Sequence, residues 1–170
     1  MKNLLIISIL IFSVFTTNAQ DKKSKKELKA EKKAQQREEI KSIVESKTFV
    51  FKANTANPMR GRTVNLTSDY DVKVTRDSIF SYLPFFGVAY SASYGGTDSP
   101  MIFNHPFETI NFENTKNGYL VKVSVKNNND RLEYSFHISV TGSTSLNVSS
   151  LNRQAISYNG NIEKIKEKKE

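Results

Sequence analysis

The fold class is decided by residues 120–140, LVKVSVKNNNDRLEYSFHISV. Apolar side chains alternate with polar ones on both sides of the central turn, at Val121, Val123 and Val125 before it and at every second position from Leu132 to Val140 after it. A period of two is the pattern of a strand with one buried face. The two runs, separated by a polar turn, therefore predict an antiparallel strand pair.

The same pattern continues outward along the chain in both directions. Further alternating runs occur at Phe49–Phe51, Val64–Leu66, Tyr70–Val74, Leu146–Val148 and Ala155–Tyr158. Asn117-Gly118 is a strong signal for a tight hairpin turn. Many short strands without intervening helices predict an all-β antiparallel domain, either a barrel or a two-sheet sandwich. Period-two patterns do not contain the strand order, so both arrangements stay open.

Residues 24–47 predict a helix in front of the β domain. They are rich in Lys, Glu, Gln and Ala and contain neither Gly nor Pro. Ser24 and Glu27 have the spacing of a capping box at the helix start. Ile40, Ile43 and Val44 share one helix face, so we expect the last two turns to pack on the β domain.

Residues 1–19 have the pattern of a secretory signal peptide. Lys2 precedes an apolar run from Leu4 to Phe15, and Thr17 and Ala19 take the positions before a cleavage site. The run is shorter than the ~20 apolar residues that span a membrane. We expect cleavage after Ala19, a periplasmic or secreted protein, and no transmembrane segment after cleavage.

The predicted organisation is therefore a signal peptide (1–19), a charged helical arm (20–47), an antiparallel β domain (48–160) and a charged tail (161–170). The net charge of +8 lies mostly outside the β domain. Residues 21–47 carry ten basic and six acidic side chains, whereas 48–160 carry ten and eight. A nucleic-acid partner is not expected, because such proteins place their basic residues on the folded surface, often among aromatic side chains.

The aromatic residues gather in one window, 80–112, which holds nine of the eighteen together with several Gly and Pro residues. One interpretation is a site for a small, partly apolar ligand. The other is that these rings fill the core of the β domain. The candidate ligand-binding residues are Tyr82, Phe85, Phe86, Tyr90, Tyr94 and Phe103, with Arg153 as an anion contact.

Catalytic chemistry has little support in this sequence. The absence of cysteine excludes disulfides, thiolate nucleophiles and Cys-ligated metal sites. Glu133, Ser135 and His137 share a strand face, but neighbours on such a face lie about 7 Å apart. A nucleophile and its base need to approach to about 3 Å. We expect no catalytic residues, no metal site and no cofactor.

Two stretches resemble a known family: YLPFFG at Tyr82–Gly87 and NRQAISYNG at Asn152–Gly160. They resemble the exported bacterial proteins known as domain of unknown function 4251. The resemblance implies a signal peptide, a charged helical lead and a β-rich domain, and it carries no established activity. Two functional hypotheses follow. The first is a non-catalytic envelope protein with an aromatic-lined site for a small, partly apolar ligand. The second is a structural or interaction protein that contacts another envelope protein through its sheet edge or its charged helix.

Overall fold

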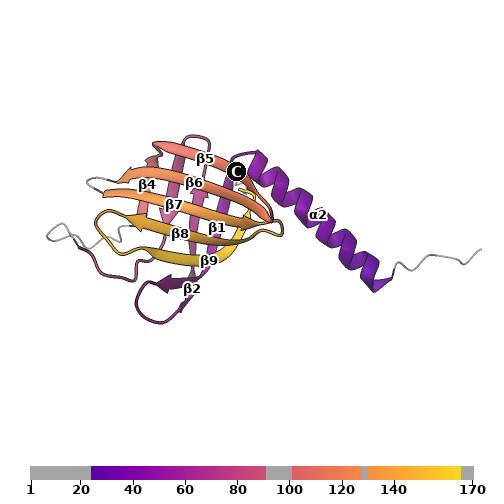
Figure 1. The fold of residues 1–170 in the computed structure, drawn as a ribbon, viewed down its shortest axis with the longest axis horizontal. Helices are drawn as coiled ribbons and strands as arrows, with labels where there is room; N and C mark the ends of the chain where they lie inside the picture. Colours follow the sequence, from indigo (N-terminus) through magenta and orange to yellow (C-terminus); the bar gives the residue numbers. More distant parts are fainter. Residues whose placement is uncertain (1–23, 91–100, 128–129, 166–170) are drawn as a thin grey trace, which may run out of the picture. The chain divides into compact units, whose positions relative to one another are not determined.

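One helix and nine strands make up the described residues of this computed structural model, which are 24–90, 101–127 and 130–165 (Figure 1). The helix is α2 (Lys25–Glu45). The strands are β1 (Phe49–Pro58), β2 (Val64–Val74), β3 (Ser78–Tyr82), β4 (Ile102–Pro106), β5 (Thr109–Thr115), β6 (Gly118–Asn127), β7 (Asp130–Ser139), β8 (Ser143–Ser150) and β9 (Ile156–Glu163). The predicted fold class, antiparallel β with one N-terminal helix, is confirmed.

Helix α2 begins as its sequence predicts and ends at Glu45, two residues before the end of the predicted segment. The backbone N–H of Ser24 donates to the Glu27 carboxylate at 2.8 Å, and the N–H of Glu27 donates to the Ser24 hydroxyl at 3.3 Å. This reciprocal pair is a capping box. The chain divides into two units between Lys32 and Lys33, so the second half of α2 belongs to the unit that contains the sheet. In that half the predicted contact residues, Ile40, Ile43 and Val44, are buried in the core.

All nine strands belong to one sheet, in the order β4-β3-β2-β1-β9-β8-β7-β6-β5. Figure 1 shows β5 to β9 side by side on one face of this curled sheet. The pairing of β1 with β9 joins the first strand to the last, with Val50 opposite Glu163 and Pro58 opposite Ile156. Of the two predicted arrangements, the structure therefore has the single curled sheet rather than two stacked sheets.

Strands β4 and β5 form one bent strand. If the chain reversed direction between every two consecutive strands, the first and the ninth strand would run in the same direction. Strands β1 and β9 instead pair antiparallel, so one connection does not reverse the chain. The connection that does not reverse is the one between β4 and β5, which lie at opposite ends of the sheet order. The N–H of Phe107 donates to Asp77 beside β3, whereas the N–H of Glu108 donates to Ser124 of β6. The chain changes sheet edge between these two residues, so the edges of the sheet curl toward each other there.

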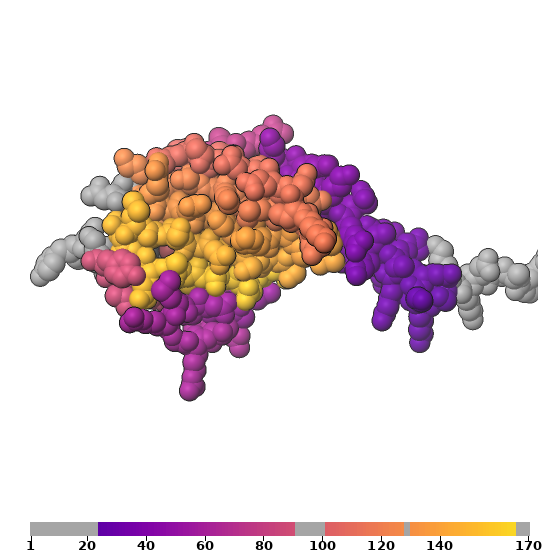
Figure 2. Space-filling view, viewed as in Figure 1, coloured from indigo at the N-terminus to yellow at the C-terminus, as the bar shows by residue number. Residues whose placement is uncertain are grey.

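Side chains fill the inside of the curl. With β4 and β5 counted as one bent strand, the sheet has eight strands. A curled sheet of eight strands encloses an interior just wide enough for packed side chains. The fully buried rings are Phe49, Phe51, Tyr134, Phe136 and Tyr158, from β1, β7 and β9. Phe136 packs edge-on against Phe49, with ring centres 5.3 Å apart. Figure 2 shows that the side chains of β6 to β9 cover most of the outer face in this view.

Two tyrosine hydroxyls lie in this interior, and both have partners. Tyr134 donates to the hydroxyl of Ser81 at 3.1 Å. Tyr158 donates to the carbonyl of Pro84 at 2.7 Å. Burial raises the pKa of Tyr134 and of Tyr158 far above the ordinary value, because the phenolate would lose its hydration. Both hydroxyls therefore stay protonated and act as hydrogen-bond donors.

Candidate functional site

The sequence-predicted ligand residues lie in different environments. Tyr82 is on the outer face of β3, 48% exposed, and stacks on Tyr70. Phe103 of β4 packs against the core, edge-on to Tyr134. Phe85 and Phe86 pack partly against the core, Tyr90 is exposed, and Tyr94 lies outside the described residues. The three cavities described below are lined by other residues, so a joint role of these side chains in ligand binding stays a prediction.

Arg153 has a structural partner. Its guanidinium donates to the buried carboxylate of Asp130 at 3.0 Å. The same carboxylate also accepts hydrogen bonds from the Ser150 hydroxyl and the Leu151 backbone N–H. Arg153 and Asp130 thereby tie the β8–β9 connection to the start of β7.

The other polar groups singled out in the sequence face solvent or hold turns. Glu133 and His137 are exposed on the outer face of β7, and the ring of His105 stacks on Phe103. The Asp77 carboxylate accepts hydrogen bonds from Ser78 and Thr75, which lower its pKa. Among the described residues, no three His, Asp or Glu side chains gather as they would around a metal ion.

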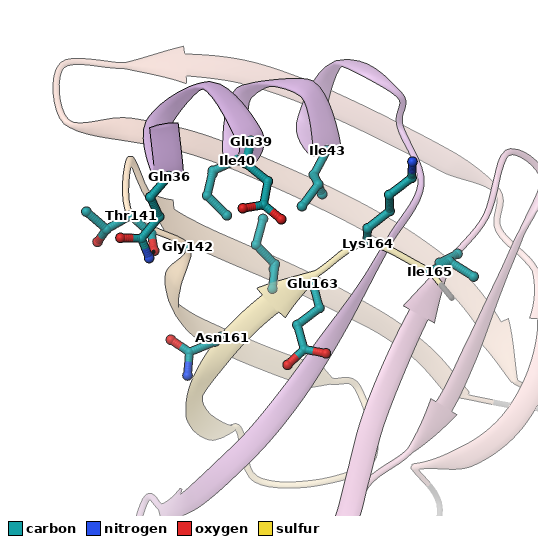
Figure 3. Close-up of a pocket in the computed structure, with 11 residues that line it drawn as sticks. Gln36, Glu39, Ile40, Ile43, Thr141, Gly142, Asn161, Glu163, Lys164 and Ile165 are labelled. Carbon is teal, nitrogen blue, oxygen red and sulfur yellow. Dashed lines mark hydrogen bonds between the residues drawn. The ribbon is translucent and has the colours of Figure 1, made fainter. Parts of the chain in front are cut away.

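Two grooves flank the second half of α2, where the helix packs across one end of the sheet. The first, the Ile40 groove, lies between the helix, the β7–β8 turn and the end of β9, with a volume of about 780 Å³. Figure 3 shows Glu39 and Ile40 on the side of the helix toward Gly142 and the end of β9. The Gln36 amide donates to the Thr141 carbonyl at 2.8 Å and closes one side. The charged groups of this groove are Glu39, Glu163 and Lys164, so its net charge is negative.

The second groove, the Phe112 groove, lies on the other side of the helix, along the unpaired edge of β5. It has a volume of about 540 Å³ between the helix end and the β5–β6 hairpin, and a further cavity of about 270 Å³ shares Lys47 and Phe112 with it. The apolar walls of the groove are Val44, Phe112, Tyr119 and Val140, and Ile110 adds to them in the smaller cavity. The charged groups of the groove are Lys41, Lys47 and Lys116 against Glu45 and Glu113, and Arg76 lines the smaller cavity, so the net charge of both is positive.

Lys47 holds an unusual backbone conformation in this groove. Its φ is 56°, in the left-handed region that usually falls to Gly at the end of a helix. A side chain with a β-carbon costs roughly 1–2 kcal/mol there. The Lys47 ammonium lies over the Phe112 ring, 5.8 Å from its centre, within the range of a cation–π interaction. A strained residue that carries a charge into a cavity is a candidate functional residue.

Local sequence patterns do not reveal most of this groove, because three segments that are distant in sequence build it. Phe112 lies inside the aromatic window but was not among the candidate residues. The hairpin at Asn117-Gly118 was predicted and is confirmed by the pairing of Thr115 with Gly118. That turn places Lys116 at the groove, so it is the one local signal in the sequence that points there.

Comparison with known proteins identifies the family. The family model described as Domain of unknown function (DUF4251) matches residues 31–162. The chain belongs to the DUF4251 family. The resemblance predicted from the two sequence stretches is therefore confirmed.

A solved structure supports the fold of this DUF4251 domain. The crystal structure of a DUF4251 family protein from Bacteroides eggerthii DSM 20697 is similar, with a TM-score of 0.56 and 16% identity. The match covers 77% of this chain and 89% of that one. At this identity the similarity concerns the fold alone. No curated protein matches the sequence.

The two stretches that carry the DUF4251 resemblance meet in space. The Tyr158 hydroxyl of the second stretch donates to the Pro84 carbonyl of the first. Just after the first stretch, Tyr90 N–H donates to the Asn152 carbonyl of the second stretch, and Gln154 N–H of the second stretch donates to the Val88 carbonyl. These bonds fasten the segment after β3 to the segment before β9. The resemblance thus lies in residues that hold the fold together, at the end of the sheet away from α2.

Proposed function

We propose that this protein is an exported, non-catalytic binding protein whose Phe112 groove holds a small ligand with an apolar body and a negatively charged group. The observation that carries the proposal is the strained Lys47, whose ammonium lies over the Phe112 ring. The backbone alone favours Gly at this position, because Gly adopts this φ without strain. A Lys at this position is explained if its charge serves binding, since proteins commonly trade stability for function.

The chemistry of the groove favours such a ligand over a purely apolar one. Small-molecule sites are concave, mostly apolar, about 300–1,000 Å³ in volume, and contain a few polar groups that fix orientation. The Phe112 groove has this volume and these walls. Lys41, Lys47, Lys116 and Arg76 outnumber the two carboxylates, so a carboxylate or sulfonate on the ligand would find complementary charge.

Two fluorescent probes test the charge requirement. Anilinonaphthalene sulfonate has an aromatic body with an anionic group, and N-phenylnaphthylamine has the same kind of body without it. We expect the folded protein to bind the sulfonate more tightly, and the preference to shrink about tenfold in the double variant Lys41→Gln, Lys116→Gln, since two exposed charges contribute about 0.5–1 kcal/mol each. Equal affinity for both probes in the unaltered protein would contradict the proposal.

Replacement of Lys47 by Gly separates binding from stability. We expect Lys47→Gly to leave the free energy of unfolding unchanged or to raise it by up to about 1 kcal/mol, because Gly adopts this φ without strain while the cation–π contact is lost. The same variant should bind the sulfonate probe more weakly. Lys126→Gln, at an exposed position of β6, is the matched control and should change neither quantity. Loss of stability in Lys47→Gly, with binding retained, would show a structural role for Lys47 instead.

Export is part of this proposal and rests on the signal-peptide pattern of residues 1–19. Among the described residues, no helix is both long and apolar enough to cross a bilayer. We expect protein recovered from outside the cytoplasm to begin at Gln20, as determined by N-terminal sequencing. Recovery of the chain only inside the cytoplasm, still beginning at Met1, would contradict this part of the proposal.

A further inference from the structure

An apolar patch lies on the outer face of β2, β3 and β4. Phe80, Tyr82 and Ile102 are 39%, 48% and 45% exposed, so three large apolar side chains face solvent on two neighbouring strands. The register places Tyr82 directly beside Ile102. Contiguous exposed apolar side chains on a soluble domain commonly mark an interaction surface. We call this surface the outer β2–β4 face.

The register arranges this face in two rows across the strands. One row is Asp71, Tyr82 and Ile102, and the other is Lys73, Phe80 and Asn104. The rows are about 7 Å apart along the strands, and neighbours within a row are about 5 Å apart. Each row therefore has a charged residue at one end and a ring in the middle, and the two rows carry opposite charges.

This pattern is complementary to itself. Consider a twofold axis in the plane of the interface, at right angles to the strands and midway between the rows. It places Asp71 of each copy over Lys73 of the other, and Tyr82 of each copy over Phe80 of the other. Twofold interfaces require such self-complementarity, because the same patch serves both partners. Sheets that pack face to face with nearly aligned strands are a common arrangement.

We propose that the outer β2–β4 face binds a second copy of this chain and forms a twofold dimer. The charge pattern argues for this occupant. A partner whose surface carries charges of one sign only would be attracted by one of Asp71 and Lys73 and repelled by the other. The two rows hold six residues, fewer than the roughly 20–30 residues a side of a stable interface. The dimer is therefore reversible, with a dissociation constant of the order of 10 μM. This inference does not depend on the Phe112 groove.

Sedimentation equilibrium of the purified protein over a range of concentrations tests the dimer. We expect a monomer–dimer equilibrium in the unaltered protein, and at least about tenfold weaker association in Lys73→Asp and in Asp71→Lys, because each places like charges opposite each other. The double exchange Asp71→Lys, Lys73→Asp restores the pattern and should restore the dimer. Tyr82→Ser should also dissociate it, whereas Glu133→Lys, at an exposed position on the outer side of β7, should leave it intact.

Three outcomes would overturn the proposal. The first is a monomer at every concentration up to about 1 mM, which would be far above the expected dissociation constant. The second is a dimer that the single charge reversals do not weaken. The third is a double exchange that remains monomeric although each variant keeps the circular dichroism spectrum of the folded protein. Because these side chains are solvent-facing, the variants should fold, and the double exchange separates loss of pairing from loss of structure.

Discussion

Phe136→Ala is expected to lower the free energy of unfolding by about 3–5 kcal/mol. The Phe136 ring is fully buried and lies at the centre of the aromatic core. Its neighbours are Phe49 and Phe51 of β1, at ring-centre distances of 5.3 and 5.9 Å, and Tyr134 of its own strand. Removal of the ring loses its burial and leaves a cavity that the surrounding packed side chains cannot fully fill.

Chemical denaturation followed by circular dichroism measures this effect. Small domains are stable by only about 5–15 kcal/mol, so we expect a large shift of the unfolding midpoint, and partial unfolding without denaturant if the protein lies at the low end of that range. Tyr90→Ala is the matched control, because it also removes an aromatic ring but at a position that is 67% exposed. It should change stability by no more than about 0.5 kcal/mol. Similar losses for both variants would mean that the core is not organised around Phe136.

Asp130→Ala is expected to cost about 3 kcal/mol, because it leaves the partly buried Arg153 guanidinium without its counter-charge. It also removes the acceptor of the Ser150 hydroxyl and of the Leu151 N–H. Arg153→Ala should cost less, about 1–2 kcal/mol, since Asp130 keeps those two hydrogen bonds. The double variant should lose less stability than the sum of the losses in the two single variants, as expected for a directly interacting pair.

The same pair decides between two roles for Arg153. If Arg153 is structural, both single variants lower the unfolding midpoint, and neither changes probe binding in the folded protein. If Arg153→Ala left stability unchanged but weakened the binding of an anionic ligand, the sequence-based hypothesis of an anion contact would be the better one. Urea unfolding and probe titration on the same samples distinguish these outcomes.

The sequence predicted the strands where one face is uniformly buried. Strands β6 and β7 follow their alternation closely, with Val121, Val123 and Val125 buried opposite Phe136, Tyr134 and Leu132. The helix contacts were also predictable, because Ile40, Ile43 and Val44 are the only clustered apolar residues of the arm. Hydrophobic periodicity is enough to predict a helix or strand when one of its faces is buried and the other faces solvent.

Between residues 64 and 115, local patterns were less informative. Two short runs were expected at Val64–Leu66 and Tyr70–Val74, yet β2 is continuous from Val64 to Val74. Polar residues at 67–69 interrupt the pattern without interrupting the strand. The bend between β4 and β5 depends on a change of pairing partner from β3 to β6, and pairing partners are not contained in alternation. The strand β9 also runs to Glu163, past the compositional boundary at 160.

The candidate site was harder still to predict. The Phe112 groove joins the end of α2, the β2–β3 turn and the β5–β6 hairpin, which are far apart in sequence. The aromatic window left open whether its rings line a site or fill the core, and Phe80, Tyr82 and Tyr90 of that window are exposed. It did not show that the fully buried rings come from β1, β7 and β9 instead.

The pairing of the first strand with the last has a consequence for the nascent chain. Strands β5 to β9 are neighbours in sequence, so their hairpins can form early in folding. Strand β1 waits for β9, its partner more than a hundred residues later, and loop-closure entropy opposes that step. Until the last strand is available, the edges of β1 and β8 remain open to pairing with other chains. The final eight-residue strand thus controls when the polypeptide stops being a substrate for chaperones, and its truncation should produce aggregation rather than a smaller folded domain.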